Sequence, residues 1–150
     1  MGRFASEMNR TASLTLPVGS ITVDGTTARR FKLYDLMLGS EATPQDSIFL
    51  WRIFGITAAG TSTAVTPKPL DASDTIACLT DSGENHTVDA TPSGGAVLSI
   101  PLNQRATFRW VASPYGELVA PATANNGFAL YTPTASALIA VTATGHFEEQ

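Results

Sequence analysis

The stretch Ile48–Ile56 constrains the fold more than any other part of the chain, because it is apolar on two faces. In an extended segment, successive side chains alternate between the two sides of a sheet. Phe49 and Trp51 then point to one side, and the alternate positions, which are apolar apart from Arg52, point to the other. One side can face the core of the domain, while the other needs a second cover. The sequence leaves open whether that cover is a loop of the same chain or a neighbouring subunit.

Most of the remaining chain consists of short segments in which apolar and polar residues alternate, as in Thr11–Val18 and Arg29–Leu38. Turns rich in Gly, Pro and Asn separate these segments, and Asp24-Gly25 and Asn125-Asn126-Gly127 are the strongest hairpin signals. Roughly 8–10 short strands separated by such turns predict an all-β fold, and we interpret it as an antiparallel β-sandwich of the jelly-roll kind.

Asp35 interrupts the alternation of the second run. In a regular strand Phe31, Leu33 and Met37 share one face, and Asp35 falls on that apolar face. A carboxylate is costly to bury without a partner. Asp35 therefore indicates either a break in register or a buried partner for an arginine or a hydroxyl group.

The length of 150 residues fits one domain, which we place at residues 11–150 as a single jelly-roll-like sandwich. Residues 1–10 show no strand alternation and are predicted to form an N-terminal arm. Such an arm is either a flexible terminus or a segment in which Phe4 and Met8 anchor to a partner.

One short helix is expected near residues 71–78, because Asp71 or Ser73 can cap its N-terminus and Asp74 favours the positive end of the helix dipole. The tail Glu148-Glu149-Gln150 is expected to be solvated.

The composition argues for a protein whose surface is covered by neighbours. Charged residues make up 15% of the chain, against roughly 25% in typical soluble domains. A net charge of -4 argues against nucleic acid as a partner, since phosphate binding relies on clustered Lys and Arg. No segment reaches the ~18 to 20 apolar residues of a membrane span, so no membrane partner is expected.

Catalytic and metal-binding patterns are weak, and we predict that the protein is not an enzyme and uses no cofactor or metal. The two histidines, His86 and His146, lie in no recognisable nucleophile motif. The single Cys78 excludes an internal disulfide framework and a cysteine-based zinc site. The acidic residues of 81–89 match no calcium-loop spacing.

Aromatic stacking on a sugar is the binding chemistry that remains. Trp51, Trp110 and Tyr115 could form such a platform. Both tryptophans lie inside strand patterns, where packing in the core is the stronger expectation, and only Tyr115, in a turn, is expected to be exposed.

Three stretches of the chain resemble a group of small structural proteins of tailed bacteriophages. The first, T-x-x-T-P-x-P-L-D, is matched at Thr63, Thr66, Pro67, Pro69, Leu70 and Asp71. The second, P-E-x-x-V-x-P, corresponds to 116–121, with Gly116 where a Pro is common, and the acidic end is matched at 147–149. The resemblance covers most of residues 47–150 and implies a jelly-roll-like virion protein that decorates or cements the capsid.

We therefore expect a capsid decoration or cement protein that stabilises the assembled phage head as a homo-oligomer, most simply a trimer, since capsids offer three-fold sites and a closed ring hides edge strands. Its partners would be the major capsid protein and further copies of itself. It would be made in the host cytoplasm and located on the capsid surface. The alternatives are a glycan-binding module on the virion, or a tail or head-completion component of the same fold. The residues expected at the interfaces are Phe4, Met8, Phe49, Trp51, Arg52, Thr63, Val65, Pro67 and Pro69.

Overall fold

β-strands make up all of the regular structure in residues 2–134 and 138–150, the part of the chain that the computed structural model describes; these residues contain no helix. The strands are β1 (Arg3–Thr11), β2 (Gly19–Val23), β3 (Phe31–Ser40), β4 (Ile48–Ala58), β5 (Thr61–Val65), β6 (Lys68–Pro69), β7 (Thr80–Val88), β8 (Thr91–Asn103), β9 (Phe108–Val111), β10 (Leu118–Ala120), β11 (Gly127–Tyr131) and β12 (Ala140–Glu149). Within the described ranges, the search for a helix long and apolar enough to cross a membrane finds none.

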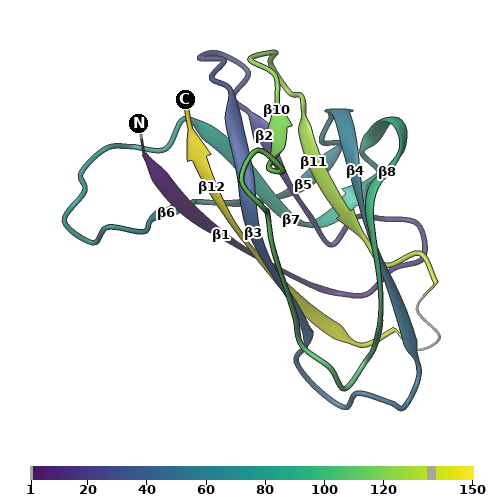
Figure 1. Cartoon of the computed structure of the whole chain (residues 1–150). Coiled ribbons are helices and arrows are strands. Elements are labelled where there is room, and N and C mark those ends of the chain that lie inside the picture. The colour runs from purple at the N-terminus through teal and green to yellow at the C-terminus, as the bar shows by residue number, and fades with distance from the viewer. Residues whose placement is uncertain (1, 135–137) are drawn as a thin grey trace.

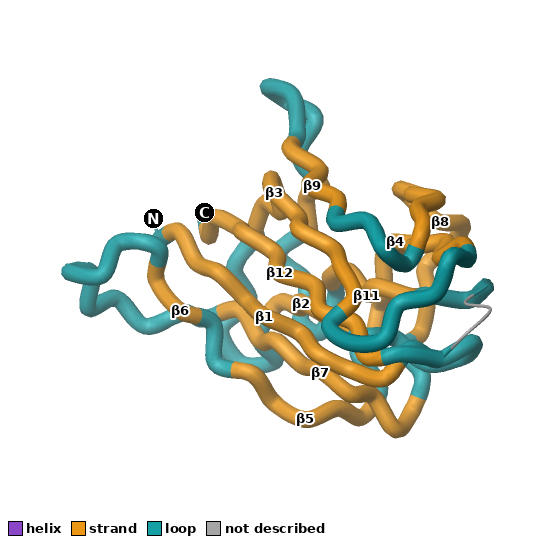
Figure 2. Tube along the Cα trace, turned by 90° about the horizontal axis from the view of Figure 1, so that it is seen from below, coloured by secondary structure: helices purple, strands orange, loops and turns teal. Residues whose placement is uncertain are grey.

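The strands form two antiparallel sheets that pack against each other (Figures 1 and 2). Sheet A has the order β10-β3-β12-β1-β6, and β9 pairs with β3 further along the edge that β10 occupies. Sheet B has the order β5-β7-β2-β11-β4-β8. The predicted all-β class and its two-sheet antiparallel arrangement are confirmed.

The core lies between the sheets and is centred on four phenylalanine rings. Phe31 of β3 lies 5.6 Å from Phe147 of β12 and 6.1 Å from Phe128 of β11, measured between ring centroids. Phe4 of β1 lies 5.8 Å from Phe147. Phe128 belongs to sheet B and the other three to sheet A, so the edge-to-face contact between Phe31 and Phe128 joins the two sheets, and the other two contacts join neighbouring strands of sheet A.

The N-terminal residues are part of this core, and the prediction of an arm over residues 1–10 is wrong for residues 3–10. β1 pairs along its whole length with β12, from Arg3 opposite Glu148 to Thr11 opposite Ala140. Phe4 and Met8 are completely buried. Alternation is present here, with Phe4, Ser6 and Met8 pointing inward, but the small polar Ser6 hides it in the sequence.

The two turn motifs that predict hairpins most strongly do not form hairpins, because each connects a strand of one sheet to a strand of the other. Asp24-Gly25 lies between β2 of sheet B and β3 of sheet A, and Asn125-Asn126-Gly127 leads from β10 of sheet A into β11 of sheet B. Asp24 does organise a turn, since its carboxylate accepts hydrogen bonds from the backbone amides of Thr26 and Thr27. Such turn chemistry reverses the chain locally but does not determine which sheet the next strand joins.

The predicted helix near 71–78 is absent, and a loop projects beyond β6 in its place (Figure 1). Asp71 begins a turn as its capping role predicts, because its carboxylate accepts a hydrogen bond from the Ser73 amide at 2.9 Å. Asp74 then accepts from the Ile76 amide at 2.9 Å, which makes a second local turn. This side-chain bonding competes with helical backbone bonding, and the β-branched Thr75 and Ile76 add little helix propensity.

A β-bulge in β3 explains the position of Asp35. His146 of β12 lies opposite Asp35 and Phe147 lies opposite Leu33, so Tyr34 is an extra residue without a partner in β12. The extra residue shifts the alternation by one position. Leu36 is therefore buried in place of Met37. Both predictions for Asp35, a break in register and an arginine partner, are confirmed. The partner is described below.

Candidate functional site: the outer face of sheet B

The residues expected at interfaces separate into two groups in the structure. Phe4, Met8, Phe49 and Trp51 are at most 1% exposed and belong to the core, so their assignment to an interface is wrong. Phe49 and Trp51 point inward because their side of β4 faces sheet A, and their rings lie 6.5 Å apart. The accessible group is Arg52, Thr63, Val65 and Pro69, whereas Pro67 is buried.

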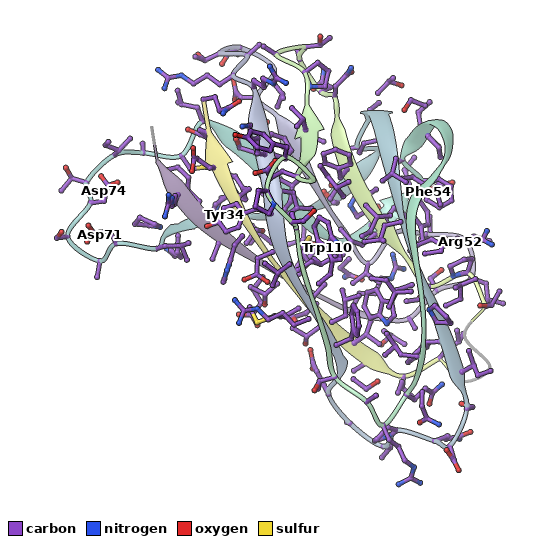
Figure 3. All side chains as sticks on the ribbon, viewed as in Figure 1. Tyr34, Arg52, Phe54, Asp71, Asp74 and Trp110 are labelled. Carbon is purple, nitrogen blue, oxygen red and sulfur yellow. The ribbon has the colours of Figure 1, made fainter. Side chains whose placement is uncertain are left out.

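The second apolar side of β4 lies on the outer face of sheet B, and the chain itself covers part of it. Ile56, Ala90, Ala129 and Tyr131 form a small apolar cluster there, separate from the main core. Phe54 packs edge-to-face on Tyr131 at 5.3 Å. The half-buried side chains of β4 that remain accessible on this face include Arg52 and Phe54, which Figure 3 labels on the same strand.

Arg52 lies near the middle of β4 on this face, opposite Ser99 of the edge strand β8 and Tyr131 of β11. Its Nε is buried from solvent, yet within the described ranges it has no hydrogen-bond acceptor. A buried donor without an acceptor costs about 1 to 3 kcal/mol. Arg52 therefore presents a cation on a mostly apolar face with bonding capacity that the described part of the chain does not use.

Both edges of sheet B are formed by strands that carry no charged residue. β5, with the sequence TSTAV, is largely exposed, and β8, with TPSGGAVLSIPLN, exposes Val97 to 51%. Edge strands in soluble proteins are usually protected by charges, prolines or short length. Pro92 and Pro101 interrupt β8, whereas β5 has none of these protections. Sheet A, by contrast, ends in the short strands β6, β9 and β10.

His86 and Ser20 form the one pair that resembles a nucleophile and its base among the described residues. Their side chains approach at 3.1 Å between Nε2 and Oγ, but His86 is fully buried and Ser20 is 1% exposed. Burial also lowers the pKa of His86, which favours the neutral ring. A substrate cannot reach this hydroxyl, so the pair links β2 to β7 as a structural contact.

Asp35 forms a second polar cluster, on the outer face of sheet A. The Arg109 Nε donates to Asp35 Oδ1 at 2.9 Å, Arg109 Nη2 bonds the other carboxylate oxygen, and His146 Nδ1 lies 3.1 Å from Oδ2. These bonds, above all those from Arg109, lower the pKa of Asp35. The cluster attaches β9 to β3 and β12.

Glu149 is buried, so the prediction that the tail is solvated is wrong for this residue. Its carboxylate accepts hydrogen bonds from the Leu79 amide at 2.8 Å and the Thr80 hydroxyl at 2.7 Å, and the Cys78 thiol lies 3.2 Å away. Burial raises the pKa of that thiol to about 12, which keeps it protonated. Glu149 thus holds the base of the projecting loop against β12.

The three aromatic residues considered for sugar binding do not meet. Trp51 is buried in the core, and Trp110 is half-buried against it. Tyr115 is 99% exposed and has a left-handed backbone with φ of 66°. The expected exposure of Tyr115 is confirmed, but a shared platform with Trp51 is excluded. Across the described ranges, no group of three or more His, Cys, Asp or Glu side chains is arranged to hold a metal ion.

Comparisons with models of known protein families, with curated proteins and with solved structures find no match to this chain.

Proposed function

We propose that the protein is a virion structural protein, a decoration or cement protein that binds the assembled phage capsid as a homo-oligomer. The observation that carries the proposal is Arg52 on the outer face of sheet B, a half-buried cation on a mostly apolar face that forms no ion pair within the described residues. Arginine with aromatic neighbours is typical of the centre of protein interfaces. A carboxylate or carbonyl group of a neighbouring subunit would pair with the accessible part of the Arg52 side chain and cover Phe54.

The uncharged edges of sheet B support the same proposal. Val97 of β8 and the strand β5 are exposed in the single chain, and association would cover them. Thr63 and Val65 of β5 are then the first candidates for strand-to-strand contact between subunits. A closed ring, such as a trimer, would leave no such edge free.

We further infer that the sandwich is a jelly roll. With β5, β6 and β7 set aside as an insertion, and β9 counted with β10 because both pair with the same edge of β3, the two sheets have the orders β10-β3-β12-β1 and β2-β11-β4-β8. Successive strands then alternate between the sheets, except where β8 follows β4. Two Greek keys rolled into eight strands give this arrangement, which is common in viral capsid domains. The fold supports the proposal only as an analogy, because one fold serves many functions.

Stabilisation of the shell would follow from linkage. A protein that binds the assembled shell but not its free subunits shifts the equilibrium toward the assembled form. The major capsid protein and neighbouring copies of this chain are therefore the proposed partners, with the capsid surface as the location.

The test uses a charge reversal at Arg52 and measures mass in solution by light scattering after size-exclusion chromatography. We expect the wild type to be an oligomer and Arg52→Glu to be a folded monomer. Arg105→Glu is the matched control, because Arg105 is exposed in the turn after β8 and its side chain forms no ion pair with any residue that the structure describes. An Arg52→Glu protein that keeps both its fold and the wild-type mass would remove sheet B from the proposed interface.

Copy number in purified particles separates decoration from the related roles. A protein present in proportion to the major capsid protein is a decoration protein. A protein present in a few copies at one vertex is a tail or head-completion component, and that result would overturn the proposal.

A further inference from the structure

A groove of about 450 Å³ lies on the outer face of sheet A, away from the interface proposed on sheet B. Lys32 and Tyr34 of β3 line it together with Arg3 of β1 and Glu148 of β12, which lie side by side across the sheet. The end of β9 and the following loop complete it with Val111, Ala112, Pro114 and Glu117. Figure 3 labels Tyr34, and Figure 2 shows the loop after β9 projecting from the sheets.

Tyr34 points out of the sandwich into this groove, since it follows the buried Leu33 in β3. It is the extra residue of the bulge, which turns Asp35 outward beside it, and bulges often occur beside binding sites. The Tyr34 carbonyl accepts a hydrogen bond from the Ala112 amide at 2.8 Å, which fixes the groove wall relative to the ring. On its other side the ring lies against His146, with centroids 6.5 Å apart. The half-buried ring therefore has a defined position.

The loop beside the groove carries a second unusual tyrosine. Tyr115 lies between the lining residues Pro114 and Glu117, is 99% exposed and has φ of 66°. A non-glycine residue in the left-handed region is uncommon, and such strain is concentrated at functional sites. An aromatic side chain held in this way at the rim contributes nothing to the core.

The charges of the groove indicate a neutral ligand. Two cations, Arg3 and Lys32, are balanced by two carboxylates, Glu117 and Glu148, and Arg3 Nε donates to Glu148 Oε2 at 3.2 Å. A site for an anion or a cation would carry an excess of the opposite charge. Alternating donors and acceptors beside an aromatic ring and small apolar side chains fit a ligand with many hydroxyl groups and an apolar ring face.

We propose that this groove binds a neutral oligosaccharide, with one sugar ring on Tyr34, its hydroxyl groups on Glu148 and Lys32, and a neighbouring sugar near Tyr115. The proposal does not depend on the assembly described above, because the groove and the proposed interface lie on opposite sheets. It also differs from a platform of tryptophans, since neither Trp51 nor Trp110 takes part.

The test begins with an array of neutral bacterial, plant and animal oligosaccharides, followed by NMR titration of the labelled wild-type protein with the sugars that bind. We expect at least one sugar to bind and to shift amide signals of residues 32–34, 111–117 and 148. An array without any bound neutral sugar overturns the proposal, as does a set of shifts confined to another face.

Variants then test the role of the ring. Tyr34→Ala is expected to weaken binding about tenfold, and Tyr34→Phe, which keeps the ring, is expected to retain most of the affinity. Met37→Ala, on the same strand but outside this groove, is the matched control and should bind as the wild type does. Equal affinity of the wild type and a folded Tyr34→Ala variant would overturn the proposal.

Discussion

Arg109 holds Asp35 by two hydrogen bonds, one of them 2.9 Å long between Nε and Oδ1, across 74 residues of sequence. Asp35 is 3% exposed, whereas the side chain of Arg109 is 60% exposed. The pair attaches the short edge strand β9 to the middle of β3 at the bulge. It therefore couples the bulge beside Tyr34 to the wall of the groove.

Asp35→Asn is expected to lower the free energy of unfolding at pH 7 by about 1 to 2 kcal/mol. This is less than a fully buried ion pair would contribute, because solvent screens the charge of Arg109. The pKa of Asp35 is lowered in the fold, so the contribution of its charge is complete above the unfolded pKa of about 3.9 and is lost as the pH falls through the folded value. Urea unfolding at pH 7 and pH 3 measures this. A difference between wild type and variant that is no smaller at pH 3 would contradict the assignment.

His86 gives the stability a second dependence on pH. The fold favours the neutral form of this side chain, whereas it favours the charged form of Asp35. Burial lowers the pKa of His86, so the unfolded chain takes up a proton first as the pH falls below about 6.5. Stability is then complete above that value and declines as the pH falls toward the folded pKa. We expect the urea midpoint to decrease between pH 7.5 and pH 5.5 in the wild type, and to decrease less in His86→Gln. Equal decreases in both proteins would assign the effect to other groups.

Glu149→Gln is expected to destabilise the protein by about 1 to 3 kcal/mol, because the amide cannot accept all of the bonds that the buried carboxylate receives. The amides of Leu79 and Thr80 should also exchange hydrogen faster, since the base of the projecting loop is released. Glu148→Gln is the matched control. It breaks only the exposed pair with Arg3 and should change stability by less than about 0.5 kcal/mol.

Gly127→Ala is expected to cost about 2 to 3 kcal/mol, because an added Cβ would lie 2.0 Å from the carbonyl oxygen of Ile21 in the neighbouring strand. Backbone atoms of β2 cannot move aside without disturbing the sheet. Gly95→Ala, where an added Cβ meets nothing within 4 Å, should remain within about 0.5 kcal/mol of the wild type. Thermal unfolding of both variants measures the contrast, and similar melting temperatures would count against the close approach at Gly127.

The all-β class was predictable because alternation and turn residues are local properties of the sequence. Which strands pair was harder to predict. Asp24-Gly25 forms its turn, yet β2 and β3 belong to different sheets. Sheet membership depends on contacts between residues far apart in the chain, and a turn motif contains no information about them. The wrong prediction for the helix near 71–78 has a different, local cause: the same Asp side chains that can cap a helix can also bond nearby amides in turns, and here those bonds replaced helical bonds.

The candidate sites were predictable in part. Arg52 was recognisable as a charge on the second face of an apolar strand, and Asp35 as a disturbance of alternation. The sequence could not assign Phe49 and Trp51 to the core side, because both sides of β4 are apolar. Alternation puts Tyr34 on the outer side of β3 together with Lys32, but the sequence does not show which other strands and which loop line the groove around it.

The pairing of β1 with β12 also determines when the protein can fold. Arg3 lies opposite Glu148, so the central ladder of sheet A joins segments separated by 145 residues. Contacts of such long range slow folding, because the loop between them must close before they contribute. During synthesis, β1 and β3 have no partner in the middle of their sheet until β12 has been made. Until then the apolar sides of β1 and β3 lack that neighbour, and unpaired strands of this kind are prone to aggregate.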